Sequence, residues 1–140
     1  MATANKFLAF TDDLAEGIHT LASDQLVFAL TAAANAPVNT NTVLANLTEI
    51  TYTNLSTRNI TTSSSTQTAG QYSLVNADLV ISASGGAANA FRYLCMYNDT
   101  ASSPLVDPLV LWWDYGSDLT LGDGESLTAD FGANTFTLGA

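Results

Sequence analysis

The sequence has few basic residues and few charges of either sign. Lys and Arg together number three in 140 residues, against thirteen Asp and Glu, which gives a formal net charge of −10 at pH 7. A chain this acidic repels nucleic-acid phosphates and anionic membrane surfaces, so we expect no nucleic acid and no membrane as partner. No uncharged apolar run approaches the roughly 20 residues of a membrane-spanning helix.

Cysteine and histidine occur once each. Cys95 rules out an internal disulfide and is compatible with synthesis in a reducing cytoplasm. Its neighbours Leu94 and Met96 indicate a small buried side chain rather than a reactive thiol. A single histidine, His19, cannot build the ligand set of a zinc site. The amino-terminal residues lack the basic and apolar regions of a signal peptide, so we expect none.

Aromatic residues concentrate in residues 91–131, which hold both Trp, three of the five Tyr and the Cys. Residues 90–97 and 109–115 are apolar at almost every position, which predicts two strands, the second covered on both faces. Residues 118–121 and 126–131 flank a Gly-Asp-Gly-Glu turn and predict a hairpin, because Gly accepts positive φ. We expect a β-meander on which the rest of the chain packs.

Weaker strand signals lie before and after this stretch. A Thr/Ser run at Arg58–Thr68 could be a mobile loop, although its β-branched content favours an exposed edge strand. Gln71–Val75 and Asp78–Ser82 predict a hairpin around Asn76-Ala77. The other expected elements are a strand at 26–31, a loop at 32–42, one helical turn within 43–50, a strand near 50–53 and a last strand at 133–138.

The amino-terminal residues 1–25 are ambiguous. Phe7, Leu8 and Phe10 begin like a strand, residues 11–16 resemble a helix N-terminus, and Ile18 begins a second short strand. We expect residues 1–25 to form an arm or hairpin that packs on a β-sandwich domain made by residues 26–140.

The fold class follows from roughly eight to ten strands at roughly 8–12-residue spacing, with no long amphipathic helix. It is predicted to be all-β: a single-domain antiparallel β-sandwich or jelly-roll-like barrel with a short N-terminal arm.

The sequence gives little indication of a catalytic or metal-binding site. A hydrolase would need His19, a Ser and an Asp in one cleft, and no nucleophile motif supports that arrangement. The acids from Asp114 to Glu125 partly match a helix–loop–helix calcium loop but lack its central Gly. We therefore predict no enzymatic activity, no cofactor and no metal site. Trp112 and Trp113 point to opposite faces of one strand, so one can be exposed as an interface anchor or a sugar platform.

Three segments carry a resemblance. Residues 91–99 read FRYLCMYND, residues 112–117 read WWDYGS, and residues 121–131 read LGDGESLTADF. In this order the chain resembles a group of small virion proteins of tailed bacteriophages. The resemblance implies a capsid decoration (cement) protein, a β-rich module that binds the assembled shell and braces it. It supplies no catalytic or binding residue.

The expected partners are the major capsid protein and further copies of the chain, as a dimer or trimer, on the capsid surface of the virion after synthesis in the host cytoplasm. Residues 2–10 and 58–68 are the expected contact segments. The contact side chains are predicted to be Lys6, Phe7, Phe10, Trp113 and Tyr115. The main alternative is a tail or adhesion protein that binds host surface glycan through Trp113 or Tyr115.

Overall fold

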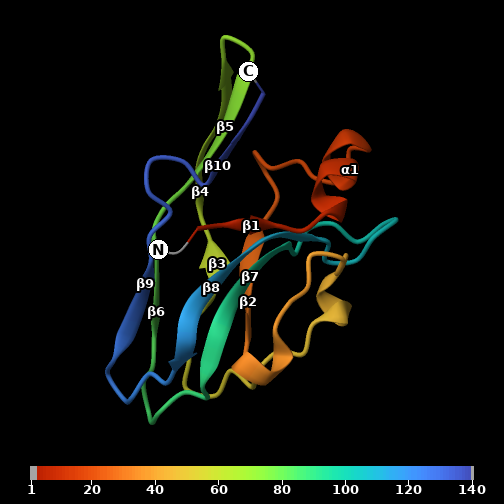
Figure 1. Ribbon diagram of the computed structural model, residues 1–140. Coiled ribbons are helices and arrows are strands. Elements are labelled where there is room, and N and C mark those ends of the chain that lie inside the picture. The colour runs from red at the N-terminus through yellow and green to blue at the C-terminus, as the bar shows by residue number, and fades with distance from the viewer. Residues whose placement is uncertain (1–2, 140) are drawn as a thin grey trace.

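The apolar stretches of the sequence form the centre of a five-stranded antiparallel sheet (Figure 1). The computed structural model describes residues 3–139. The strands of this sheet, in spatial order, are β1 (Asn5–Lys6), β8 (Leu109–Leu119), β7 (Phe91–Asn98), β2 (Leu26–Thr31) and β3 (Asn59–Ile60). The predicted strands at 26–31, 90–97 and 109–115 are thereby confirmed.

A second layer consists of a three-stranded and a two-stranded sheet. Their strands, in spatial order, are β10 (Phe136–Leu138), β5 (Gln71–Asn76) and β4 (Thr62–Thr68), then β6 (Leu79–Ser82) and β9 (Ser126–Ala129). The segment 71–82 runs antiparallel to the segment 126–138. Strand β5 pairs with β10, and strand β6 pairs with β9. The architecture is all-β, with antiparallel sheets packed together, as the sequence predicts.

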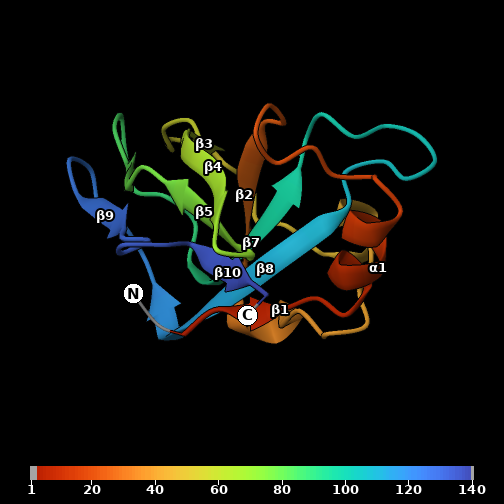
Figure 2. The ribbon, with the colours of Figure 1, turned by 90° about the horizontal axis from the view of Figure 1, so that it is seen from above.

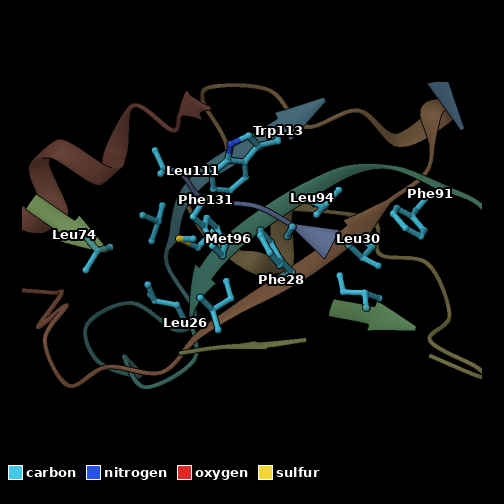
Figure 3. Packing of buried hydrophobic residues seen from close by; sticks show 14 of the residues in the cluster. Leu26, Phe28, Leu30, Leu74, Phe91, Leu94, Met96, Leu111, Trp113 and Phe131 are labelled. Carbon is cyan, nitrogen blue, oxygen red and sulfur yellow. The ribbon is translucent and has the colours of Figure 1, made fainter. Parts of the chain in front are cut away.

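The main core lies between these two layers (Figure 3). Three rings meet there: Phe28 from β2 stacks on Phe131, which follows β9, with centroids 5.8 Å apart. The ring of Trp113 from β8 contacts both edge-on, at 5.7 Å from Phe28 and 5.9 Å from Phe131. Such offset and edge-to-face pairs are the arrangement that aromatic quadrupoles prefer, so this trio ties the layers together.

The opposite face of the five-stranded sheet carries a second cluster. Its buried members are Phe7, Val27, Ala29, Tyr93, Cys95, Tyr97 and Leu109. Leu44 and Leu47, from a loop with a 3₁₀ turn (η2, Leu44–Asn46), pack over it. The sheet is therefore covered on both faces, which explains why β2, β7 and the first half of β8 have few polar residues.

The amino-terminal segment is built into the sheet. Asn5 and Lys6 form β1, paired with Trp112 and Leu111 of β8, and helix α1 (Ala9–Ala15) follows. Residues 18–20 have no regular structure and a turn begins at Leu21, so the expected second strand does not form. Figure 2 shows α1 at the opposite end of the molecule from β9. Within residues 3–139, no helix is long and apolar enough to cross a membrane.

Both predicted hairpins are wrong in their pairing, although strands form in each of the two regions. The chain turns at residues 122–125, but β9 pairs with β6 in the second layer and not with β8. Likewise β5 and β6 are consecutive strands that pair with β10 and β9, not with each other. Asn76 does not turn the chain back, because its backbone N–H and side-chain oxygen both bind the Thr135 hydroxyl, at 3.2 and 2.6 Å.

The remaining short elements follow the predictions in part. The Thr/Ser run forms β3 and β4, which confirms a strand there, and the helical turn after residue 43 is η2. Residues 32–42 form the expected loop, with a 3₁₀ turn at Ala33–Asn35 (η1). No strand forms at 50–53; the Ile50 N–H bonds to the Leu30 carbonyl at 2.9 Å within a loop.

Candidate interaction surface

Phe7 and Phe10 belong to the interior, so their prediction as partner contacts is corrected. Phe7 is fully buried in the cluster under β1, and Phe10 is 1% exposed. The Phe10 ring on α1 meets His19 at 5.2 Å and Phe136 at 5.4 Å. Both rings point inward, because in an outward position these large apolar side chains would be exposed to water. Ala2 of the expected contact segment lies outside the described residues.

Lys6 and Leu8 are exposed residues of this segment, as is Thr3. Lys6 Nζ donates to the Thr11 hydroxyl at 2.7 Å, and Leu8 is 58% exposed. The other two cations are engaged elsewhere: Arg58 lies over the Tyr52 ring at 3.5 Å, and Arg92 pairs with an acid. Lys6 is therefore the cation whose charge faces solvent within residues 3–139.

Trp112 and Trp113 lie on opposite faces of β8, as predicted, but the partly exposed residue is Trp112 and not Trp113. Trp113 is only 4% exposed and lies in the main core, so its prediction as a surface contact is also corrected. Trp112 is half-buried on the other face, where its Nε1 donates to the Asn39 side-chain oxygen at 3.2 Å. Tyr115 is 47% exposed, in a region where β8 bulges away from β7.

His19 takes part in a buried hydrogen-bond network. Its Nδ1 is 3.0 Å from the Asn98 side-chain amide, which also donates to Asp24 at 2.5 Å. The amide donates, so Nδ1 accepts, and the neutral ring carries its proton on Nε2. Burial lowers the His19 pKa below its ordinary value, and Asp24 opposes that shift. Within residues 3–139, no Ser hydroxyl hydrogen-bonds His19, so the geometry of a triad is not assembled.

The acids between Asp114 and Glu125 do not converge on one point. Each accepts a hydrogen bond from a different part of the chain or from its own turn. The donors are Arg92 and the Gly116 N–H for Asp114, the Ala33 N–H for Asp118, the Gly85 N–H for Asp123 and the Gly122 N–H for Glu125. Across the described part of the chain, no three His, Cys, Asp or Glu side chains are placed to hold a metal ion.

Cys95 is fully buried at the centre of β7. Burial raises the pKa of its thiol to about 12, so the thiolate is not populated near neutral pH. The prediction of a small buried side chain is confirmed.

The segments that carry the resemblance are joined to one another in space. Arg92 of the first segment makes two hydrogen bonds to Asp114 of the second, at 2.8 and 3.0 Å. Phe131 of the third packs on Trp113 of the second. Asn98, at the end of the first, accepts the N–H groups of the following turn at 3.0 and 3.2 Å. The shared pattern therefore consists of residues that hold the two layers and their turns.

One part of the surface is free of charge. Strands β4, β5 and β10 form what we term the neutral sheet, because residues 59–77 and 131–139 contain no Asp, Glu, Lys, Arg or His. Its outer face carries Ser64, Thr66, Thr68, Ser73 and Thr137. The β4–β5 hairpin extends beyond the rest of the molecule at the top of Figure 1. A chain with net charge −10 thus presents one projecting, hydroxyl-rich surface with no charge of its own.

A hollow of about 410 Å³ lies beneath this hairpin. Leu14, His19 and Leu21 line one side, and Tyr72 and Leu138 line the other. The unpartnered Nε2 of His19 is itself covered by protein atoms, so it does not face the hollow. The lining also includes Ser65 and Tyr72, whose hydroxyls hydrogen-bond each other at 2.8 Å.

Comparisons of the chain with protein-family models, with curated proteins and with solved structures gave no match.

Proposed function

We propose that this protein binds the outer surface of an assembled bacteriophage capsid and stabilises it, as a decoration or cement protein. The observation that carries the proposal is the resemblance of residues 91–99, 112–117 and 121–131 to small virion proteins of tailed bacteriophages. The roles of these residues support it, because Arg92, Asp114 and Phe131 maintain a scaffold and take part in no reactive constellation. Because the residues shared with those virion proteins hold the fold together, the function is proposed to reside in the outer surface of the protein.

The mechanism is linkage between binding and assembly. A protein that binds only the assembled, expanded shell stabilises that state by about 2.7 kcal/mol per site when its free concentration is about 100 times Kd. A copy, or a pair of copies, that bridges two capsomers gains further affinity from effective concentration alone. The partner in this proposal is the major capsid protein, and no bond is made or broken.

The contact surface is proposed to comprise the neutral sheet and the exposed residues near the amino terminus. An acidic protein avoids charge repulsion at a contact if the contacting surface is itself uncharged. Lys6, Leu8 and Tyr115 add one cation and two exposed apolar groups without disturbing either core cluster. Phe7, Phe10 and Trp113 contribute indirectly, since they hold β1, α1 and β8 in place.

Immunogold labelling of intact virions tests the proposal. Gold distributed over the whole head supports decoration. Gold confined to the tail supports the rival function, an adhesion protein, for which the exposed Tyr115 ring is the remaining candidate glycan contact.

Surface substitutions then locate the contact. Lys6→Glu and Tyr115→Ser are expected to lower capsid occupancy, because both side chains are exposed and neither is part of the core. Val80→Ser on β6, which is 53% exposed and lies outside the proposed surface, is the matched control and should leave occupancy unchanged. Normal occupancy of both Lys6→Glu and Tyr115→Ser removes these residues from the contact.

A further inference from the structure

Strand β4 presents an open edge. It is the outermost strand of the neutral sheet and pairs only with β5. Elsewhere in the described part of the chain, no segment makes a backbone hydrogen bond to residues 62–68. Seven residues at about 3.4 Å each present ~24 Å of backbone whose outward N–H and C=O groups lack protein partners.

The usual protection of an edge strand is missing from β4. Proteins guard such edges with Lys, Pro, inward-pointing charges or strong bulges, because an open edge is a template for another strand. The sequence of β4, TSSSTQT, contains no charge and no Pro, and its one irregularity lies at its start, between Thr62 and Ser64. Residues 66–68 are exposed, so the far half of the strand is accessible.

We propose that β4 pairs antiparallel with β4 of a second copy of this chain across a twofold axis. The axis passes near Ser65, so that Ser64 of each copy lies opposite Thr66 of the other. The two neutral sheets then form one six-stranded sheet with the order β10-β5-β4-β4-β5-β10. An antiparallel strand edge is complementary to itself, as a twofold interface requires.

Charge identifies the second copy as the partner. Contact between two copies through the charged part of the surface brings acids against acids, since the chain carries thirteen acids and three cations. Pairing through β4 brings together segments that contain no charge, and the nearest charged residues along the chain are Arg58 and Asp78. Thr and Ser pairs across antiparallel strands are favourable, and no charge on β4 would select a different partner.

The dimer is expected to be weak. One strand pair buries less than the ~1,200 Å² typical of a stable complex, so the association is expected to be transient, with a Kd in the micromolar range. The inference does not depend on capsid binding, because it concerns the isolated chain. Its failure would leave the proposed capsid function standing, and the reverse also holds.

Sedimentation equilibrium over a concentration series, with substitutions at Thr66, tests this inference. Thr66→Glu and Thr66→Lys each place like charges near one another across the axis, so each is expected to weaken dimerisation at least tenfold. An equimolar mixture of the two variants should recover association, because the charges are then opposite. Thermal unfolding of each variant confirms that it is folded.

The matched control is Thr137→Glu. Thr137 is exposed on the same outer face of the neutral sheet, but it lies on β10, two strands from the proposed axis. This variant should keep the wild-type Kd. The inference is overturned by a wild-type chain that stays monomeric to ~1 mM, well above the expected Kd. It is also overturned by a trimer, or by a Thr137→Glu variant that loses association as Thr66→Glu does.

Discussion

Arg92 and Asp114 face each other across β7 and β8 in a two-point ion pair. The guanidinium Nε and Nη2 lie 2.8 and 3.0 Å from the two carboxylate oxygens. The same carboxylate accepts the Gly116 N–H at 2.8 Å, at the start of the bulge that exposes Tyr115. The pair therefore connects two of the segments that carry the resemblance and fixes the backbone between Asp114 and Gly116.

Asp114 is expected to titrate below the ordinary pKa of an aspartate. The hydrogen bonds from Arg92, then that from Gly116, lower its pKa. Arg92→Gln should move the Asp114 pKa back towards the ordinary range, as followed by the carboxyl carbon shift in NMR. Because the folded-state pKa is the lower one, the pair stabilises the fold at neutral pH and loses this effect as the pH falls through that pKa. An Asp114 titration that is the same in both proteins would contradict this account.

His19 is expected to make stability fall in mildly acidic solution. Burial lowers its pKa in the folded state, so the unfolded chain binds the proton more readily below the ordinary His pKa of about 6.5. The free energy of unfolding should therefore decrease as the pH falls below this value. His19→Gln removes the titration, so denaturant melts should show a flatter pH dependence between neutral and mildly acidic pH. If His19→Gln kept the wild-type slope of unfolding free energy against pH, His19 would be excluded as the source of that slope.

Asn98 should be among the residues most sensitive to substitution. It is fully buried, donates to His19 and Asp24, and accepts from Thr100 and Ala101. Asn98→Ala leaves several buried groups without partners, so we expect a loss of about 3 kcal/mol or more in denaturant melts. Asn98→Asp keeps the shape of the side chain but places a second carboxylate next to Asp24. The loss of stability in this variant should therefore become smaller as the pH falls and the carboxylates are protonated. A loss below about 1 kcal/mol for Asn98→Ala would contradict the role of this network.

Asp13 is expected to reduce stability at neutral pH. Its side chain is 6% exposed, and its Oδ2 has no hydrogen-bond partner within residues 3–139. Burial, and then the adjacent charge of Asp12, raises its pKa. Asp13→Asn should increase the free energy of unfolding at pH 7 by up to about 1 kcal/mol, and less at acid pH, where Asp13 is protonated. Asp12→Asn removes the same charge from an exposed site and should change stability little.

Ala69 offers a position where a substitution should stabilise the neutral sheet. It adopts φ of 51° at the tip of the β4–β5 hairpin, followed by Gly70 at 83°. Two successive positive φ values favour Asn-Gly, and a left-handed alanine costs roughly 1 kcal/mol. Ala69→Asn should therefore raise the thermal midpoint, whereas the β-branched Ala69→Val should lower it. Equal midpoints for the two variants would show that the turn is not held in this conformation.

The sequence predicts the centre of this fold well because burial on both faces leaves a local trace. Residues 26–31, 91–98 and 109–113 are nearly continuous apolar runs, and each forms a strand of the covered sheet. Which strand pairs with which leaves no comparable pattern in the local sequence. The turn chemistry at 122–125 is local and was predicted, but the pairing of β9 with β6 depends on contacts more than 40 residues apart in the chain, such as Leu79 with Ala129.

The candidate surface was predicted less well, for a related reason. Alternation along β8 places Trp112 and Trp113 on opposite faces, but it does not say which face meets the second layer. For Phe7 and Phe10 the local signal was weak, because Phe7 directly follows a two-residue strand and Phe10 lies in a seven-residue helix. Arg92 and Asp114 carry a recoverable signal: pairing the two apolar runs as a hairpin places Asp114 opposite Tyr93, next to Arg92.

Binding to purified shells tests the central claim most directly. Expanded capsids of the encoding phage that lack this protein would be mixed with increasing amounts of it, and bound protein and the midpoint of thermal shell disruption would be measured. The account predicts saturable binding at a fixed number of copies per shell, together with a rise in the midpoint that follows occupancy. Binding no greater than that of an unrelated acidic protein, with an unchanged midpoint, would contradict it.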